Sequence, residues 1–146
     1  MAKNVPQTYA NHRRLVPLYH VVAFLLVAAY VLWTLWQVIR HFSVGALMAF
    51  LFALGVLIVM WYARVFATTV QDRVIRLEMR LRLQQVLPDD LKPRIGDFSV
   101  EQLVSLRFAG DGELPDLARR VLDEKIADRE EIKKLVKDWQ GDYLRA

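Results

Sequence analysis

The sequence contains no cysteine, which excludes disulfides, thiolate nucleophiles and cysteine-ligated metal sites. Acidic residues are absent from the front of the chain, where the first is Asp72, although five basic residues precede it. The glycines are isolated, so the chain has no glycine-rich loop that could bind a phosphate. These absences leave few ways to build a catalytic site, and we expect a protein that is not an enzyme.

A long apolar run is what the chain has instead. It extends from Val16 to Tyr62 and is interrupted only at residues 40–43. A membrane core about 30 Å thick needs roughly 20 apolar helical residues. The run therefore predicts two transmembrane helices, at about 16–39 and 44–64, joined by a tight turn. The first is too long for the apolar region of a cleavable signal peptide, so it should remain as an anchor.

Aromatic and charged residues agree with this hairpin. Tyr and Trp side chains fall near the predicted membrane surfaces, where amphipathic rings are enriched. The turn carries only Arg40, whereas the other basic residues flank the hairpin, so the positive-inside rule predicts that both termini are cytoplasmic. Basic residues next to the bilayer are expected to contact lipid headgroups. These residues are Arg13, Arg14, Arg64, Arg73, Arg76 and Arg80.

A seam of small and apolar residues follows the second apolar segment. Its members recur at alternating spacings of three and four, which places them on one side of a helix. Small residues let helices approach closely in lipid, so the first span is the expected partner inside the membrane. Beyond the membrane the seam must meet another protomer, a different protein or the tail's own helices. The seam consists of Ala46, Ala49, Ala53, Val56, Met60, Ala63, Ala67, Val70, Val74, Leu77 and Leu81.

The second helix should leave the membrane without a break. No proline or glycine lies between Gly55 and Pro88, so one rod is predicted to end near Leu87, with Thr68–Thr69 as the alternative break. The chain then divides into five parts. They are a basic arm (1–15), the transmembrane hairpin (16–64), a juxtamembrane amphipathic helix (65–87), a connector (88–98) and a cytoplasmic helical domain (99–146).

Three short amphipathic helices are predicted in the tail. Ser99 and Gln102 form a capping box for the first, which should end near Phe108. The second should run from about Leu114 to Ile126. Asp128 should cap the third, on which Ile132, Leu135, Val136 and Trp139 make one buried face. The predicted fold is all-α: a two-helix transmembrane hairpin, a second helix extended into the cytosol, and a bundle of about three short helices.

The three histidines offer the one alternative to this picture. His12, His20 and His41 are separated from the carboxylates along the chain, so no metal site is expected. His20, near the inner end of the first span, could present its imidazole to a haem or a chlorophyll-type pigment. A polar contact with headgroups or backbone is the simpler interpretation, and we predict no cofactor. Neither span holds a carboxylate or lysine, the groups that usually mark ion pathways.

Several stretches resemble a family of small bacterial two-span inner-membrane proteins that is catalogued as a domain of unknown function. The resemblance implies a bacterial inner-membrane location and no particular activity. It covers nearly the whole chain and rests on residues 9–14, 17–20, 70–78, 106–109, 113–115 and 142–145.

The seam leads to the functional hypothesis, because it extends beyond its intramolecular partner. We expect a non-enzymatic scaffold or accessory subunit that self-associates or docks on a larger membrane complex. Its partners would be membrane lipids and a second copy or another membrane protein. No nucleic acid or small-molecule substrate is indicated. A cofactor-binding or transport accessory subunit that uses His20 remains the alternative.

Overall fold

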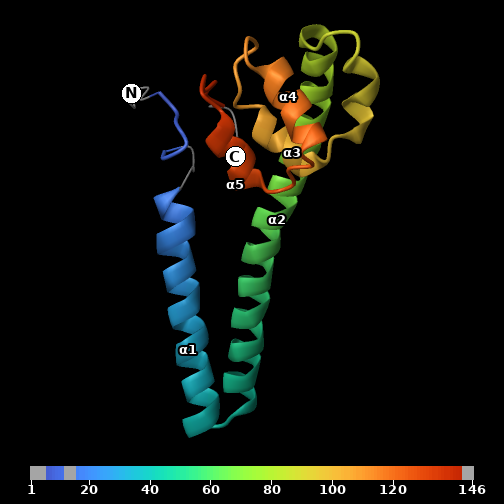
Figure 1. Cartoon of the computed structure of the whole chain (residues 1–146). Helices are drawn as coiled ribbons and strands as arrows, with labels where there is room; N and C mark the ends of the chain where they lie inside the picture. The colour runs from blue at the N-terminus through green and yellow to red at the C-terminus, as the bar shows by residue number, and fades with distance from the viewer. Residues whose placement is uncertain (1–5, 12–15, 143–146) are drawn as a thin grey trace. The chain divides into compact units, whose positions relative to one another are not determined.

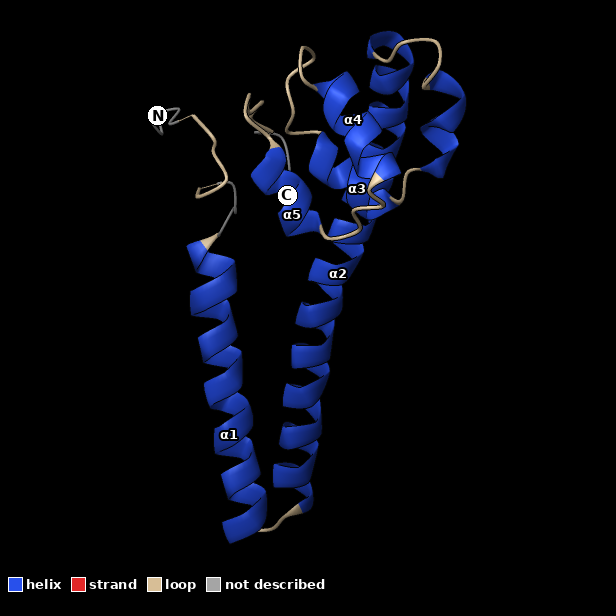
Figure 2. Cartoon of the chain, in the orientation of Figure 1, coloured by secondary structure: helices blue, strands red, loops and turns tan. Residues whose placement is uncertain are grey.

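The computed structural model describes residues 6–11 and 16–142, and these form helices but no strand (Figures 1 and 2). A π-helical segment (η1, Leu18–Ala23) leads into α1 (Phe24–Arg40), and α2 (Val44–Val86) follows. A 3-10 helix (η2, Lys92–Asp97) precedes α3 (Val100–Leu106), α4 (Leu114–Asp123) and α5 (Arg129–Leu135). Two long apolar helices followed by shorter ones confirm the predicted fold.

The chain divides into two compact units. One is Arg14–Ala67, and the other is Thr68–Ala146 together with Met1–Arg13. We call the first the hairpin and the second the C-terminal domain, and we treat each by itself. The segment 16–64, for which the sequence predicts a transmembrane hairpin, lies within the residues of the first unit. The C-terminal domain begins inside α2 rather than after it.

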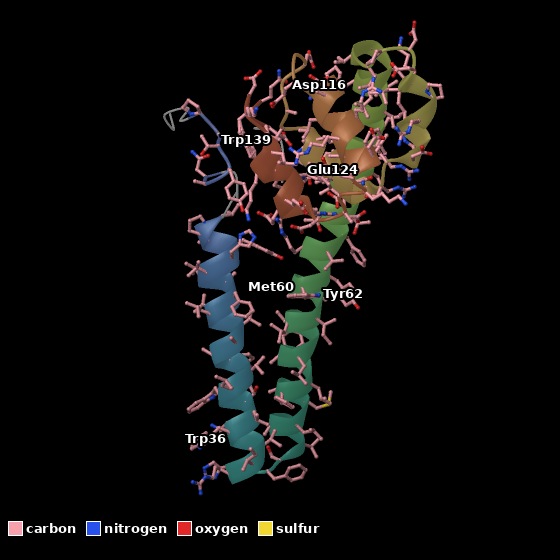
Figure 3. The ribbon with its side chains drawn as sticks, in the orientation of Figure 1. Trp36, Met60, Tyr62, Asp116, Glu124 and Trp139 are labelled. Atoms are coloured by element: carbon pink, nitrogen blue, oxygen red, sulfur yellow. The ribbon has the colours of Figure 1, made fainter. Side chains whose placement is uncertain are left out.

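The hairpin consists of α1 and the first half of α2, which run in opposite directions (Figure 1). The turn between them ends at Ser43, whose Oγ accepts a hydrogen bond from the N–H of Ala46 at 3.0 Å and so caps α2. Thr34 of α1 and Ala53 of α2 are buried. At the other end of the hairpin the Tyr19 hydroxyl donates to the carbonyl of Met60 at 2.6 Å. Met60 and Tyr62 project to opposite sides of α2 (Figure 3).

Helix α2 is unbroken from Val44 to Val86 and contains 43 residues. The predicted rod is therefore confirmed, and no break occurs at Thr68–Thr69. The helix stops just before Pro88, whose ring removes a backbone donor and restricts the residue before it.

The core of the C-terminal domain forms on one face of α2. This face presents Ile75, Met79 and Leu83, with Leu87 just beyond the helix end, and all four are buried. Successive members are four residues apart, so they lie on one side of the helix. Side chains from the connector and from α3, α4 and α5 complete the core. They are Leu91, Ile95, Phe98, Leu103, Val104, Leu106, Ala109, Leu114, Leu117, Ala118, Val121, Ile126 and Ile132.

Ion pairs hold the connector against α4. Arg119 contacts Asp90 at 2.7 Å, and Arg94 contacts Asp123 at 2.8 Å. The hydrogen bond from the Arg119 guanidinium lowers the pKa of the Asp90 carboxyl below its usual value. Residues 88–98 are thus an ordered part of the domain, with Leu91, Ile95 and Phe98 in the core.

The third short helix ends earlier than the sequence predicts. Asp128 caps it as expected, accepting the N–H of Glu131 at 3.0 Å, but α5 stops at Leu135. The prediction that Trp139 lies on its buried face is wrong. Instead Trp139 forms an isolated bridge with Ala109, and its ring packs edge-on against Phe108 at 4.6 Å.

The early end of α5 has a long-range cause. The carboxylate of Glu113 accepts the backbone N–H groups of Lys137 and Asp138 at 3.0–3.2 Å. The N–H of Gly110 donates to the Asp138 carbonyl, and that of Gln140 donates to the Phe108 carbonyl. These partners lie more than twenty residues away in sequence, so helical periodicity does not reveal them.

The predicted capping box of α3 is present and gives a first testable expectation. Ser99 Oγ accepts the N–H of Gln102, and Gln102 Oε1 accepts the N–H of Ser99. Ser99→Ala leaves one end of the helix uncapped, so it should lower the free energy of unfolding of the domain by about 1 kcal/mol. The measurement is the urea midpoint at which the full-length protein, in mild detergent, becomes susceptible to a protease pulse.

Ser99→Thr is the matched control for this change. It keeps a hydroxyl acceptor at the same position, so its urea midpoint should stay close to that of the wild type. Equal losses for the alanine and threonine variants would show that the side-chain bond contributes nothing.

Candidate interaction surface on the second helix

The part of α2 that belongs to the C-terminal domain has two apolar faces. One is the buried core face. On the other, Val70, Val74, Leu77 and Leu81 are 61%, 50%, 62% and 56% exposed. We call these four residues the α2 stripe. Their spacings of four, three and four place them on one side of the helix. Leu83 of the core face is two positions after Leu81 of the stripe, so it points about 200° away from Leu81 around the helix axis. The stripe therefore faces away from the core of its own domain.

The stripe is the outer half of the seam predicted from the sequence. Three occupants were expected there: another protomer, a different protein or the tail's own helices. The described helices that follow α2 pack on its core face and leave the stripe exposed. The other two occupants remain proposals.

The inner half of the seam lies in the hairpin and is divided. Ala53 is buried, and Ala46 and Ala49 are half-buried where they line a hollow together with Thr34 and Gln37 of α1. By contrast Ala63 and Ala67 are exposed, and Val56 is 37% exposed. The first span thus covers one edge of the seam near the turn. The edge that continues into the α2 stripe is uncovered.

Charged residues border the α2 stripe. Arg73 and Arg80 follow one edge, and Glu78 lies on the other edge, one position after Leu77. Arg73 and Glu78 are exposed, and neither makes an ion pair or hydrogen bond with any described residue. The stripe therefore combines an apolar centre with unpaired charges of both signs at its rim, which is the composition of a helix-packing surface.

The predicted headgroup-binding arginines are not gathered into one site. Arg73 and Arg76 are exposed, whereas Arg64 and Arg80 are half-buried. Arg64 lines a hollow with Tyr19 and His20. Arg13 and Arg14 lie outside the described residues. Contact of these residues with lipid stays a prediction.

A polar cluster that sequence reasoning missed lies beside the core face. The Arg82 guanidinium donates to Asp111, to the carbonyls of Arg107 and Ala109, and to Gln140. Its side chain is only 21% exposed. Carbonyls at the end of a helix carry partial negative charge, so a cation is favoured there. Arg82 therefore ties α2 to the loop after α3 and to the C-terminal segment.

The same cluster continues to the N-terminal arm. Arg107 pairs with Asp142 at 3.1 Å. The side-chain amide of Gln7 donates to the Asp142 carbonyl at 3.0 Å and accepts the Asp142 N–H at 2.9 Å. Residues 6–11 are thus part of the C-terminal domain rather than only a headgroup-binding arm. Nothing in the local sequence signals these contacts, because the partners are 135 positions apart.

His20 lies in the hairpin, where the structure gives it backbone contacts. Its Nδ1 is 3.1 Å from both the nitrogen and the oxygen of Val16, and its ring lies edge-on to that of Tyr19. The adjoining hollow has a volume of about 160 Å³, below the roughly 300 Å³ at which small-molecule sites begin. Within the described part of the chain no three histidine or carboxylate side chains come together to hold a metal ion.

Comparison with known proteins gives a family but no activity. No curated protein and no solved structure matches the chain. The match to a protein family, by contrast, extends over residues 1–146 and confirms that the chain resembles a family of unknown function. The chain accordingly belongs to DUF6526, a family of unknown function.

Proposed function

We propose that this protein is a membrane-anchored, non-enzymatic interaction subunit. The hairpin anchors it in a bacterial inner membrane with both termini in the cytosol. The α2 stripe then docks a second copy of the protein or a larger membrane complex. The observation that carries the proposal is the exposure of the stripe on the side of α2 away from its own domain.

Exposure of the apolar helices supports the membrane anchor. Both long helices are apolar enough to cross a membrane, yet only 6% of the most apolar stretch of each is buried. The core helix of a soluble protein would be mostly buried. Side chains such as Leu25, Phe52 and Ile58 are instead more than half exposed. Lipid is the solvent in which so large an apolar surface is stable.

Charge distribution supports the orientation. The turn between α1 and α2 carries Arg40 alone, while every acidic residue and most basic residues follow α2's apolar part. Cytoplasmic segments next to a membrane are enriched in Lys and Arg. The C-terminal domain is therefore proposed to be cytosolic.

A first experiment tests the anchor and its orientation. Vesicles from cells expressing the full chain should retain the protein after washing with alkaline carbonate. A C-terminal tag should resist protease added outside spheroplasts and should be digested once the membrane is permeabilised. Release by carbonate would contradict the anchor, and digestion in intact spheroplasts would contradict the orientation.

A second experiment tests the docking surface. Val74→Glu combined with Leu77→Glu places two charges in the α2 stripe and should shift the protein, extracted in mild detergent, to a smaller assembly on native electrophoresis. Arg76→Glu is the control, because it changes the net charge by the same amount at an exposed position outside the stripe. An unchanged assembly size for the double variant would contradict the proposed function.

A further inference from the structure

We propose that the occupant of the α2 stripe is the α2 stripe of a second copy of this chain, packed as a parallel two-stranded coiled coil in register. This inference rests on the proposed function and makes it specific. It commits to one partner, one direction and one pairing of charges.

The spacing of the stripe fits a coiled-coil seam. Val74 and Leu81 occupy a positions of a heptad, and Val70 and Leu77 occupy d positions, with Ala67 at the preceding a. The two central layers, Val74 at a and Leu77 at d, are the combination that favours two strands over three or four. The next d position is Gln84, where the apolar seam ends.

Charges at the rim favour the parallel direction. Arg73 occupies a g position and Glu78 the e position five residues later. In a parallel coil g of one helix lies beside the following e of its partner, so each dimer would form two pairs between Arg73 and the other copy's Glu78. These two side chains have no ion-pair partner among the described residues of their own chain, so both are available for the pairing.

The antiparallel direction brings like charges together. There g faces g, so Arg73 would lie near Arg80 of the other copy, and repulsion between them opposes that arrangement. Two chains anchored in one bilayer with the same orientation also have parallel α2 helices. Shared anchoring raises the effective concentration of the two stripes, which makes a seam of only about two heptads sufficient.

The core face of α2 stays free for its own domain in such a dimer. Ile75, Met79 and Leu83 fall at b, f and c positions, outside the seam. Each protomer therefore keeps its domain on the outside of the coil, and dimerisation requires no refolding.

Disulfide crosslinking tests the direction and the register. The chain has no native cysteine, so single substitutions suffice. Val70→Cys, Val74→Cys, Leu77→Cys and Leu81→Cys should each form a dimer band on oxidation in native membranes, because both a and d layers bring paired Cα atoms within disulfide range. Arg76→Cys, which lies off the seam, is the control and should give about tenfold less crosslinked dimer than the stripe positions.

Charge reversal tests the pairing itself. Arg73→Glu and Glu78→Arg each create two repulsive pairs per homodimer and should lower crosslinking through Leu77→Cys roughly three- to tenfold. Coexpression of the two variants with different tags should restore it in mixed dimers, because every g–e' pair is then attractive. The combined variant Arg73→Glu/Glu78→Arg should also recover crosslinking through Leu77→Cys, because its homodimer again pairs opposite charges.

The outcomes separate this inference from the function on which it rests. Absence of crosslinks at the four stripe positions, together with a smaller assembly for Val74→Glu/Leu77→Glu, would overturn the second copy and leave a different protein as the partner. Crosslinks at only one stripe position would overturn the parallel direction. Crosslinks at Arg76→Cys as strong as those at the stripe would show random collision and overturn the inference. If Val74→Glu/Leu77→Glu left the assembly size unchanged, that result would contradict the proposed function as well.

Discussion

Replacement of Leu83 by alanine should destabilise the C-terminal domain by about 3 kcal/mol. Leu83 has no exposed surface and lies on the core face of α2 between Met79 and Leu87. Truncation of a fully buried leucine loses its transfer free energy and leaves a cavity that the surrounding helices fill only in part. For a small domain this is a third to a half of the total free energy of unfolding.

The urea midpoint for protease susceptibility of the full-length protein measures this loss. With a slope of about 1–2 kcal/mol per M, the midpoint should fall by roughly 2 M. Leu81→Ala is the matched control, since it removes the same atoms two positions away on the exposed stripe and should change the midpoint of the monomeric protein by less than about 0.5 M. Equal shifts for the two variants would mean that the domain packs on both faces of α2.

Arg82→Ala should cost the same domain about 2–4 kcal/mol. The side chain is mostly buried, and its loss leaves the carbonyls of Arg107 and Ala109 and the carboxylate of Asp111 without their cationic donor. Hydrogen bonds to a charged group contribute more than neutral ones, and the two part-buried carbonyls add a desolvation cost when they are left unpaired, whereas the exposed Asp111 carboxylate can be solvated by water. The C-terminal segment, held by Gln140, should loosen first.

Limited trypsin digestion and the urea midpoint together measure this effect. Arg82→Ala should expose the C-terminal segment to cleavage at lower protease concentration and lower the midpoint. Arg82→Lys keeps the charge but lacks the planar guanidinium, so it should recover only part of the stability. Arg120→Ala is the control, because Arg120 forms an exposed pair with Glu124 one turn away and should cost no more than about 0.5 kcal/mol. Should Arg82→Ala behave like Arg120→Ala, the cluster would carry no stability.

Local patterns predicted much of the architecture. The two apolar segments became α1 and α2 because length and composition alone make helices of that kind. The cap residues Ser99 and Asp128 act where the sequence predicts them, since a cap needs only a neighbouring N–H. The continuity of α2 through Thr68 likewise follows from the absence of any helix-breaking residue.

Long-range contacts escaped the same reasoning. The end of α5 depends on Glu113, and the place of Trp139 depends on Ala109 and Phe108. The links from Arg82 to the loop after α3 and from Gln7 to Asp142 are of the same kind. Periodicity and capping describe neighbours along the chain, so they contain no information about partners that only folding brings together.

The sequence by itself determined that α2 is one long helix and that its apolar seam continues beyond the part that α1 can cover. It did not determine which apolar face the domain covers, because beyond Thr68 the helix has two: Val74 and Leu77 on one, Met79 and Leu83 on the other. Both faces satisfy helical periodicity equally well. The tertiary structure chose the second, since only packing of the connector and the three short helices can distinguish them, and that choice left the α2 stripe exposed.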